Sequence, residues 1–119
     1  MRSEHLPVFK AALDLCVYLD SMVKNMEKYH KYGIGSEMRE TSREMLYLVN
    51  SANVQKAEER VVCLRELVQK CEKLKLMILL AKEIKAFKSF KQFEHSSLLS
   101  VSVCKQAQAW LGASARVSL

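Results

Sequence analysis

The sequence predicts an all-α protein with the architecture of an antiparallel up-down four-helix bundle. One proline and three glycines in 119 residues are too few for a turn-rich β fold and indicate long uninterrupted helices. Half of the residues are hydrophobic, which is enough for one core, and six of them are methionines, which favour helices. Because domains of about 100–150 residues are the commonest size, we expect a single domain that spans residues 1–119.

The first helix is predicted over about residues 7–27. Pro7 suits the first helical turn, where its missing N–H loses no hydrogen bond. Apolar residues recur at spacings of three and four and define one face: Val8, Ala11, Ala12, Leu15, Tyr18, Leu19, Met22 and Met26. A turn with two tyrosines is expected at residues 28–33, with Gly33 as the helix-stopping residue.

The second helix is predicted over about residues 34–51. Thr41 and Ser42 occupy the middle of a face whose other positions are apolar: Ile34, Met38, Met45, Leu48 and Val49. Residues 50–53 should end this helix, and Asn53 is predicted to cap the helix that follows.

The third helix is predicted over about residues 55–87 and carries a seven-residue repeat typical of a bundle seam. The repeat forms two rows: Ala57, Leu64, Cys71 and Ile78 in one, and Leu67, Leu74 and Ala81 in the other. Around residues 76–81 the helix is apolar on every side, and a four-helix monomer covers only one side of each helix. The pattern therefore favours a neighbouring subunit over complete wrapping by the other helices.

The fourth helix is predicted over about residues 90–112. Ser89 followed by Gln92 matches a capping box, in which the two side chains serve free backbone N–H groups. Gly112 is the expected stop, and residues 113–119 are expected to be frayed.

The formal net charge of +6 is concentrated in residues 55–91, which hold ten basic and five acidic residues. A basic field of this kind favours polyanions, nucleic acid above all, although such an excess also occurs on domains without that partner. The candidate phosphate-binding residues are nine in number: Lys82, Lys85 and Lys88 first, then Lys28, Lys31, Arg39 and Arg43, and also Lys56 and Arg60.

Two of these assignments have structural alternatives. Lysines at a helix C-terminus also complement the helix dipole and extend from the end of a core to solvent. Either this structural role or binding of a polyanion accounts for Lys82, Lys85 and Lys88. Tyr29 and Tyr32 could stack on bases, but packing against the fourth helix is the favoured interpretation for both.

Motifs for catalysis, cofactors and metals are not found in the sequence. The three histidines stand apart from one another and from cysteine, and no phosphate-binding glycine loop or nucleophile motif occurs. The four cysteines, scattered among apolar residues, are expected to be small buried hydrophobes of a reducing cytoplasm. We therefore expect a cytoplasmic protein that is not an enzyme, has no cofactor or metal, and does not enter a membrane, since its longest apolar run is short.

Four motifs in order resemble the Avd family, the accessory proteins of diversity-generating retroelements, whose fold is related to proteins encoded in ribosomal RNA intervening sequences. Together they cover about residues 6–112. The motifs are Leu6-Pro7-Val8-Phe9, then Lys31-Tyr32-Gly33-Ile34-Gly35 with Arg39, then the third-helix segments 64–74 and 79–83, and Phe90-Lys91-Gln92-Phe93-Glu94. Gly33 departs from the family, which often has Thr there. The segment 48–53 favours the Avd branch over the intervening-sequence branch.

This resemblance implies a four-helix bundle that assembles into a homopentameric barrel with a basic surface. It also implies a non-catalytic role in mutagenic retrohoming, in which the protein binds the element's reverse transcriptase together with template RNA or cDNA. Two alternatives stay open. One is a structural or protein-interaction module whose charge serves solubility, and the other is a ribosomal RNA-associated bundle protein.

Overall fold

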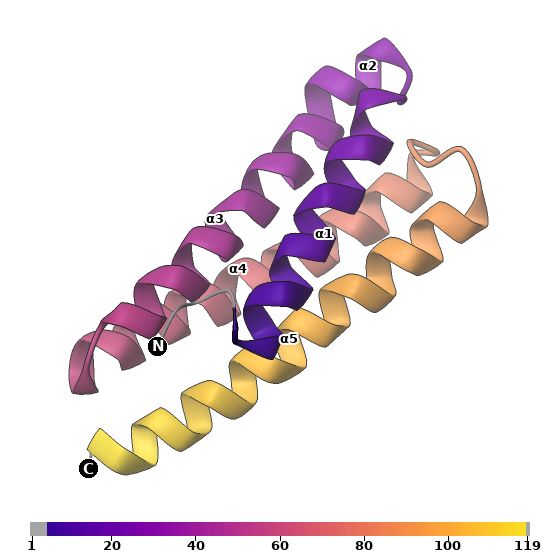
Figure 1. Cartoon of the computed structure of the whole chain (residues 1–119). Helices are drawn as coiled ribbons and strands as arrows, with labels where there is room; N and C mark the ends of the chain where they lie inside the picture. Colours follow the sequence, from indigo (N-terminus) through magenta and orange to yellow (C-terminus); the bar gives the residue numbers. More distant parts are fainter. Residues whose placement is uncertain (1–4, 119) are drawn as a thin grey trace.

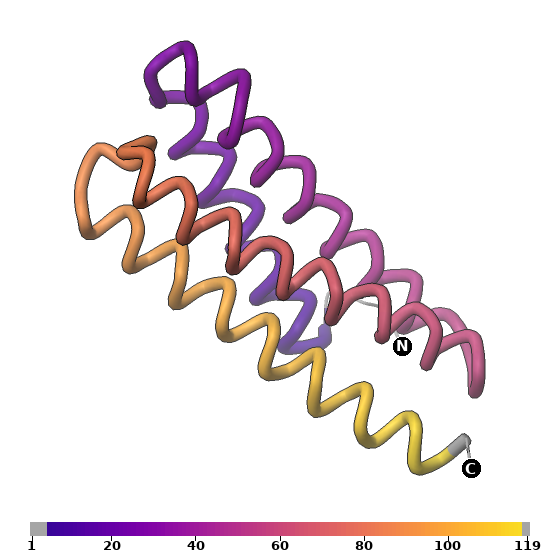
Figure 2. The backbone as a smooth tube through the Cα atoms, turned by 180° about the vertical axis from the view of Figure 1, so that it is seen from behind, coloured from indigo at the N-terminus to yellow at the C-terminus, as the bar shows by residue number. Residues whose placement is uncertain are grey.

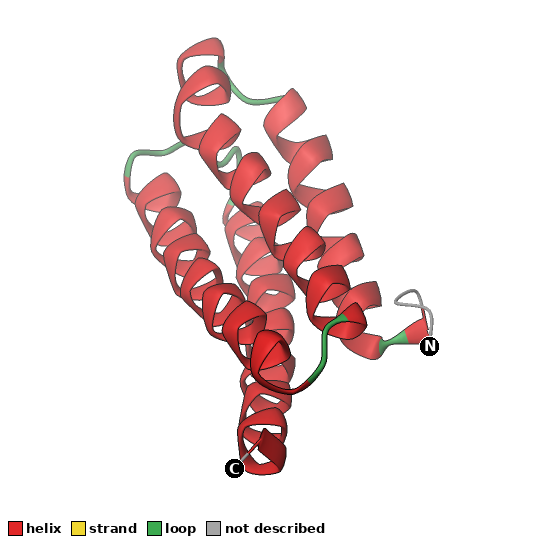
Figure 3. Cartoon of the chain, turned by 90° about the vertical axis from the view of Figure 1, so that its left-hand side faces the viewer, coloured by secondary structure: helices red, strands yellow, loops and turns green. Residues whose placement is uncertain are grey.

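The computed structural model describes residues 5–118, which form four long helices in up-down order (Figure 1). These are α1 (Pro7–Lys24), α3 (Ser36–Val54), α4 (Ala57–Glu83) and α5 (Phe90–Ser118). A short helix, α2 (Lys28–His30), and a π-helical turn, η2 (Lys31–Gly35), join α1 to α3. The predicted all-α class and helical-bundle architecture are confirmed. Seen from the side, the connections lie at the two ends of the bundle (Figure 3).

The four helices enclose one core in a molecule of 47 × 23 × 21 Å (Figure 2). α1 packs against α3 and α5, and α4 packs against the same two helices from the other side. Both predicted rows of the third helix are buried except at Ala57, which is exposed at the start of α4. Thr41 and Ser42 are also buried, as the pattern of the second helix predicts.

The first connection differs from the prediction. α1 ends at Lys24 rather than at residue 27, and the N–H groups of Asn25 and Met26 donate to the carbonyl oxygens of Met22 and Val23. Residues 28–33 were predicted to form a turn, but they are helical and continue through η2 into α3. Only Gly33 has non-helical dihedral angles within η2 (φ −104°, ψ −112°). The chain kinks at Gly33, so this glycine interrupts the helix as expected, although the residues on both sides of it are helical.

Three further boundaries are corrected. α4 begins at Ala57 after Lys56, which forms no side-chain cap, so Asn53 does not cap this helix. α4 also ends at Glu83 rather than at residue 87. α5 continues past Gly112 to Ser118, so the expected stop and the frayed segment 113–118 are wrong; Leu119 lies outside the described residues. One glycine inside a helix costs only about 1 kcal/mol, and the partly buried Trp110 and Leu111 hold this part of α5 against the core.

The predicted capping box at the start of α5 is present with one difference. The Gln92 N–H donates to Ser89 Oγ at 3.3 Å, as expected for the cap. The Gln92 side chain accepts from the Lys88 N–H at 2.8 Å rather than from that of Ser89. The cap thus fixes the last residues of the α4–α5 connection as well as the helix start.

Gly35 is the glycine that the fold requires. A Cβ at this position would lie 2.9 Å from the His30 carbonyl oxygen, 2.8 Å from Met26 Sδ and 2.9 Å from Val23 Cγ1. The contact with a backbone oxygen cannot be relieved by a side-chain rotation. Gly35 therefore allows α3 to approach the end of α1 closely.

Replacing Gly35 by Ala should destabilise the protein by about 1–3 kcal/mol, because the added methyl group overpacks the α1–α3 junction. Gly112→Ala is the matched control: a Cβ there meets only Arg116 Nη1 at 3.6 Å, so this change should stabilise α5 by about 0.5–1 kcal/mol. Urea unfolding followed by circular dichroism measures both. Equal stability of the two variants would contradict this account of the junction.

Candidate nucleic-acid interface

The up-down order brings two connections to the same end of the bundle (Figure 1). We call residues 24–35 and 82–91 the basic end. These two segments contain seven lysines and two glutamates, a net charge of +5 against +6 for the whole chain. Nearly all of the excess positive charge is therefore gathered at one end of the molecule.

The nine predicted cations divide into three groups. Lys28, Lys31, Lys82, Lys85 and Lys88 lie at the basic end. Arg39 and Arg43 lie on α3, within its first two or three turns. Lys56 and Arg60 lie at the opposite end of α4, which spans about 40 Å over its 27 residues. The nine residues therefore do not form one surface.

Lys85 occupies a special backbone position at the end of α4. Its φ is 62°, in the left-handed region that favours glycine. The Lys85 N–H donates to the Lys82 carbonyl oxygen, and the Ala86 N–H donates to that of Ala81 at 2.8 Å, which is the bonding of a Schellman motif. A lysine here is less stable than a glycine would be, and its side chain is exposed.

The lysines of the basic end differ in what they contact. Lys82 Nζ lies 4.9 Å from the centroid of the Phe93 ring and in the last turn of α4, so the structural role predicted for it is present. Lys31 Nζ lies 5.7 Å from the Tyr32 ring centroid. Within residues 5–118, none of the seven lysines of the basic end forms an ion pair, and Lys28, Lys85 and Lys88 are among those that also contact no aromatic ring.

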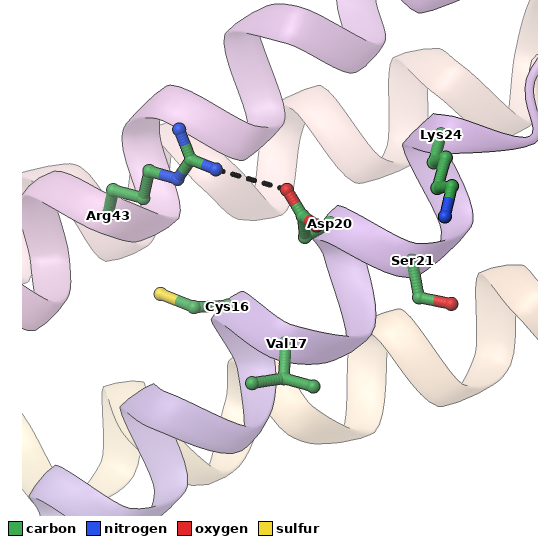
Figure 4. A pocket seen from close by; sticks show the side chains of 6 residues that line it. All are labelled: Cys16, Val17, Asp20, Ser21, Lys24 and Arg43. Atoms are coloured by element: carbon green, nitrogen blue, oxygen red, sulfur yellow. Dashed lines mark hydrogen bonds and ion pairs between the residues drawn. The ribbon is translucent and has the colours of Figure 1, made fainter.

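Arg39 and Arg43 are partly neutralised by an aspartate of α1. Arg43 Nη2 lies 3.0 Å from Asp20 Oδ1, and Arg39 Nη1 lies 3.9 Å from the same oxygen. Figure 4 shows Arg43 reaching from α3 to Asp20 across a hollow of about 410 Å³. These two arginines therefore contribute less to the positive field than the sequence suggests.

The same hollow contains a thiol. Cys16 Sγ donates to the Ser42 carbonyl oxygen at 3.1 Å. Burial raises the pKa of the Cys16 thiol, which keeps it protonated at neutral pH. A protonated thiol is a poor nucleophile, so this hollow lacks an activated cysteine.

Arg60 has a structural role rather than a binding role. Its Nε donates to the Ala52 carbonyl oxygen at 2.8 Å and its Nη2 to the Asn53 carbonyl oxygen at 3.1 Å. Its guanidinium carbon also lies 5.8 Å from the centroid of the Trp110 ring. Arg60 thus joins the end of α3, the start of α4 and the last turns of α5.

Sequence reasoning missed Lys24 and Lys91, which belong to the basic end. Lys24 is the last residue of α1, and Lys91 is the second residue of α5. The signal that could have found them is topological: in an up-down bundle, the end of the first helix and the start of the fourth lie together. The tyrosines were also misjudged, since Tyr29 and Tyr32 are 79% and 70% exposed and do not pack against α5.

The residues that the structure describes contain neither a candidate metal site nor a helix suited to cross a membrane. No group of three or more His, Cys, Asp or Glu side chains in residues 5–118 could hold a metal ion. Over the same range, none of the helices combines the length and hydrophobicity that crossing a membrane requires.

Comparison with known proteins identifies no protein family whose model matches the chain, and no curated protein with significant similarity to it.

Replacing Arg60 by Ala should lower the free energy of unfolding by about 1–2 kcal/mol, because two carbonyl groups at the end of α3 lose a charged donor. Arg60→Lys is the conservative control and should recover only part of the loss, since an ammonium group cannot reproduce both hydrogen bonds and the ring contact. Urea unfolding measures the change. A variant as stable as the wild type would show that Arg60 does not support the α3–α4 connection.

Proposed function

We propose that the protein is a non-catalytic accessory subunit of a diversity-generating retroelement. It binds the element's reverse transcriptase and its template RNA or cDNA, and the basic end makes the nucleic-acid contacts. The observation that carries the proposal is the convergence of seven lysines from two distant segments on one end of the bundle. The resemblance of residues 6–112 to the Avd family supports the identity of the partners.

The proposed binding mechanism is electrostatic. Lysines that contact phosphates release the counterions condensed on the nucleic acid, so affinity falls steeply as salt rises. Phosphate contacts carry little sequence information, so binding should be weakly sequence-specific. Such binding suits a subunit that holds RNA and cDNA for a polymerase rather than selecting one short site.

Charge reversal at three lysines of the basic end that form no ion pair tests the proposal. Lys28, Lys85 and Lys88 changed together to Glu should abolish binding of a structured RNA at physiological salt, and any binding left at low salt should show a salt slope smaller by roughly one per lysine. The control variant changes Arg65, Lys73 and Lys105 to Glu; these residues are exposed and outside the basic end, so the two variants have the same net charge. Fluorescence anisotropy compares the two. Equal losses would mean that net charge, not the basic end, governs binding.

Lys85→Gly separates binding from stability. Glycine relieves the left-handed conformation, so the variant should be more stable by about 0.5–1 kcal/mol while binding RNA more weakly. Thermal unfolding and anisotropy on the same preparation measure the two effects. A gain in stability with unchanged affinity would remove Lys85 from the interface.

We further propose that copies of the chain associate through α4, as the resemblance to a homopentameric family implies. Leu76, Leu79, Leu80 and Ile84 follow one another at helical spacing, and all four are exposed in the single chain. Leu76 alone is 69% exposed. A stripe of this kind at a bundle surface favours burial against a partner.

Replacing Leu76 and Leu80 together by Gln should shift the protein toward monomer with little loss of fold stability, because both side chains are solvent-facing in the bundle. Val17→Gln on α1, also at an exposed position, is the control and should leave the assembly unchanged. Light scattering over a range of concentrations gives the subunit number. A wild-type protein that is monomeric throughout would contradict self-association through α4.

The alternative of a structural or interaction module rests on the same leucine stripe. It predicts assembly without RNA affinity beyond that of any basic protein. The ribosomal alternative predicts a preference for ribosomal RNA and a gene placed inside a ribosomal RNA insertion. RNA competition and gene position therefore separate the three functions.

A further inference from the structure

Building on the proposed nucleic-acid binding, we propose that the basic end is specific for single-stranded nucleic acid and that Tyr29 and Tyr32 stack on its unpaired bases. The proposed ligand is therefore not any polyanion but a nucleic-acid strand whose bases are unpaired and accessible to aromatic side chains.

The two tyrosine side chains are exposed to solvent and do not pack against the helices of the bundle. Tyr29 lies in α2 and Tyr32 in η2, with 79% and 70% of their surfaces exposed. Each contacts only near neighbours among the ring and cation pairs: Tyr29 meets the His30 ring edge-on at 5.3 Å, and Tyr32 lies 5.7 Å from Lys31 Nζ. Most of each side chain therefore remains accessible to a ligand.

A third aromatic side chain is displayed at the other connection of the basic end. Phe90, the first residue of α5, is 63% exposed, and its ring lies 5.6 Å from that of Phe93. Phe93 in turn contacts Phe87 at 6.0 Å and Lys82 at 4.9 Å. Phe90 thus packs against Phe93 on one side, while much of its surface faces solvent.

Lysines flank the displayed rings in sequence. Lys28 precedes Tyr29, Lys31 precedes Tyr32, and Lys91 follows Phe90. Each ring can therefore contact a base while the adjacent ammonium group contacts a phosphate of the same strand. Alternation of cationic and aromatic contacts is the chemistry by which proteins bind single strands without reading their sequence.

A duplex fits this surface less well. Its bases are stacked on one another, so the exposed rings would face phosphates and sugars and would gain nothing from their aromatic character. In a single strand every base offers a face, and stacking on an aromatic side chain adds to the phosphate contacts. The displayed tyrosines therefore favour the unpaired ligand.

The test compares three fluorescent probes with the same number of phosphates: a single-stranded oligonucleotide of about 24 nucleotides, the same strand without bases, and a hairpin duplex closed by a base-free linker. The wild-type protein should bind the single strand tightest. Changing Tyr29 and Tyr32 together to Leu should weaken that binding by about tenfold or more and leave the base-free strand unaffected. Changing both to Phe should restore the affinity. Tyr47→Leu, at a 65% exposed tyrosine of α3, should change nothing.

The outcomes distinguish base stacking by the tyrosines from phosphate binding by the basic end. If the wild-type protein binds all three probes equally and the Leu variant binds like the wild type, stacking is overturned while phosphate binding stands. If no probe binds at low salt, both proposals fail. If the Leu variant loses binding to the base-free strand as well, the tyrosines act by supporting the surface, and stacking is overturned.

Discussion

The packing of α4 against both α3 and α5 is the constraint on which the rest of the structure depends. Leu64, Leu67, Leu74 and Ile78 are fully or almost fully buried and form a continuous seam along this helix. α1 then completes the core by packing against the same two neighbours. Because the connections are short, consecutive long helices run in opposite directions, and the first and third connections come to one end. The basic end is a consequence of this order.

Helix dipoles do not create the positive field at that end. α1 and α4 finish there with the negative ends of their dipoles, whereas α3 and α5 begin there with the positive ends. These contributions oppose one another in pairs, so the field comes from the lysine side chains. The positive field is weaker where α1 adjoins α3, because the carboxylate of Asp20 pairs with Arg43 and lies near Arg39.

The parts of the fold that depend on periodicity could be predicted, and those that depend on tertiary contact could not. The seam of α4 and the polar positions Thr41 and Ser42 follow from helical spacing alone. The role of Gly35 follows from the close approach of His30, Met26 and Val23, which no local pattern reveals. The candidate interface shows the same division: its lysines were visible as charges, but placing Lys24 and Lys91 with them, and excluding Arg60, required the structure.

Several departures from local rules occur at the basic end. There a lysine adopts a left-handed conformation, the chain kinks at Gly33 on its path from α1 to α3, and three large aromatic side chains remain exposed. Such departures tend to be retained at functional sites, where local stability is given up for the placement of side chains. At the opposite end, Arg60 satisfies the carbonyl groups of α3, although the left-handed Ala57 there has no structural explanation. Left-handed residues therefore occur at both ends, and what distinguishes the basic end apart from its charge is the exposure of three aromatic side chains.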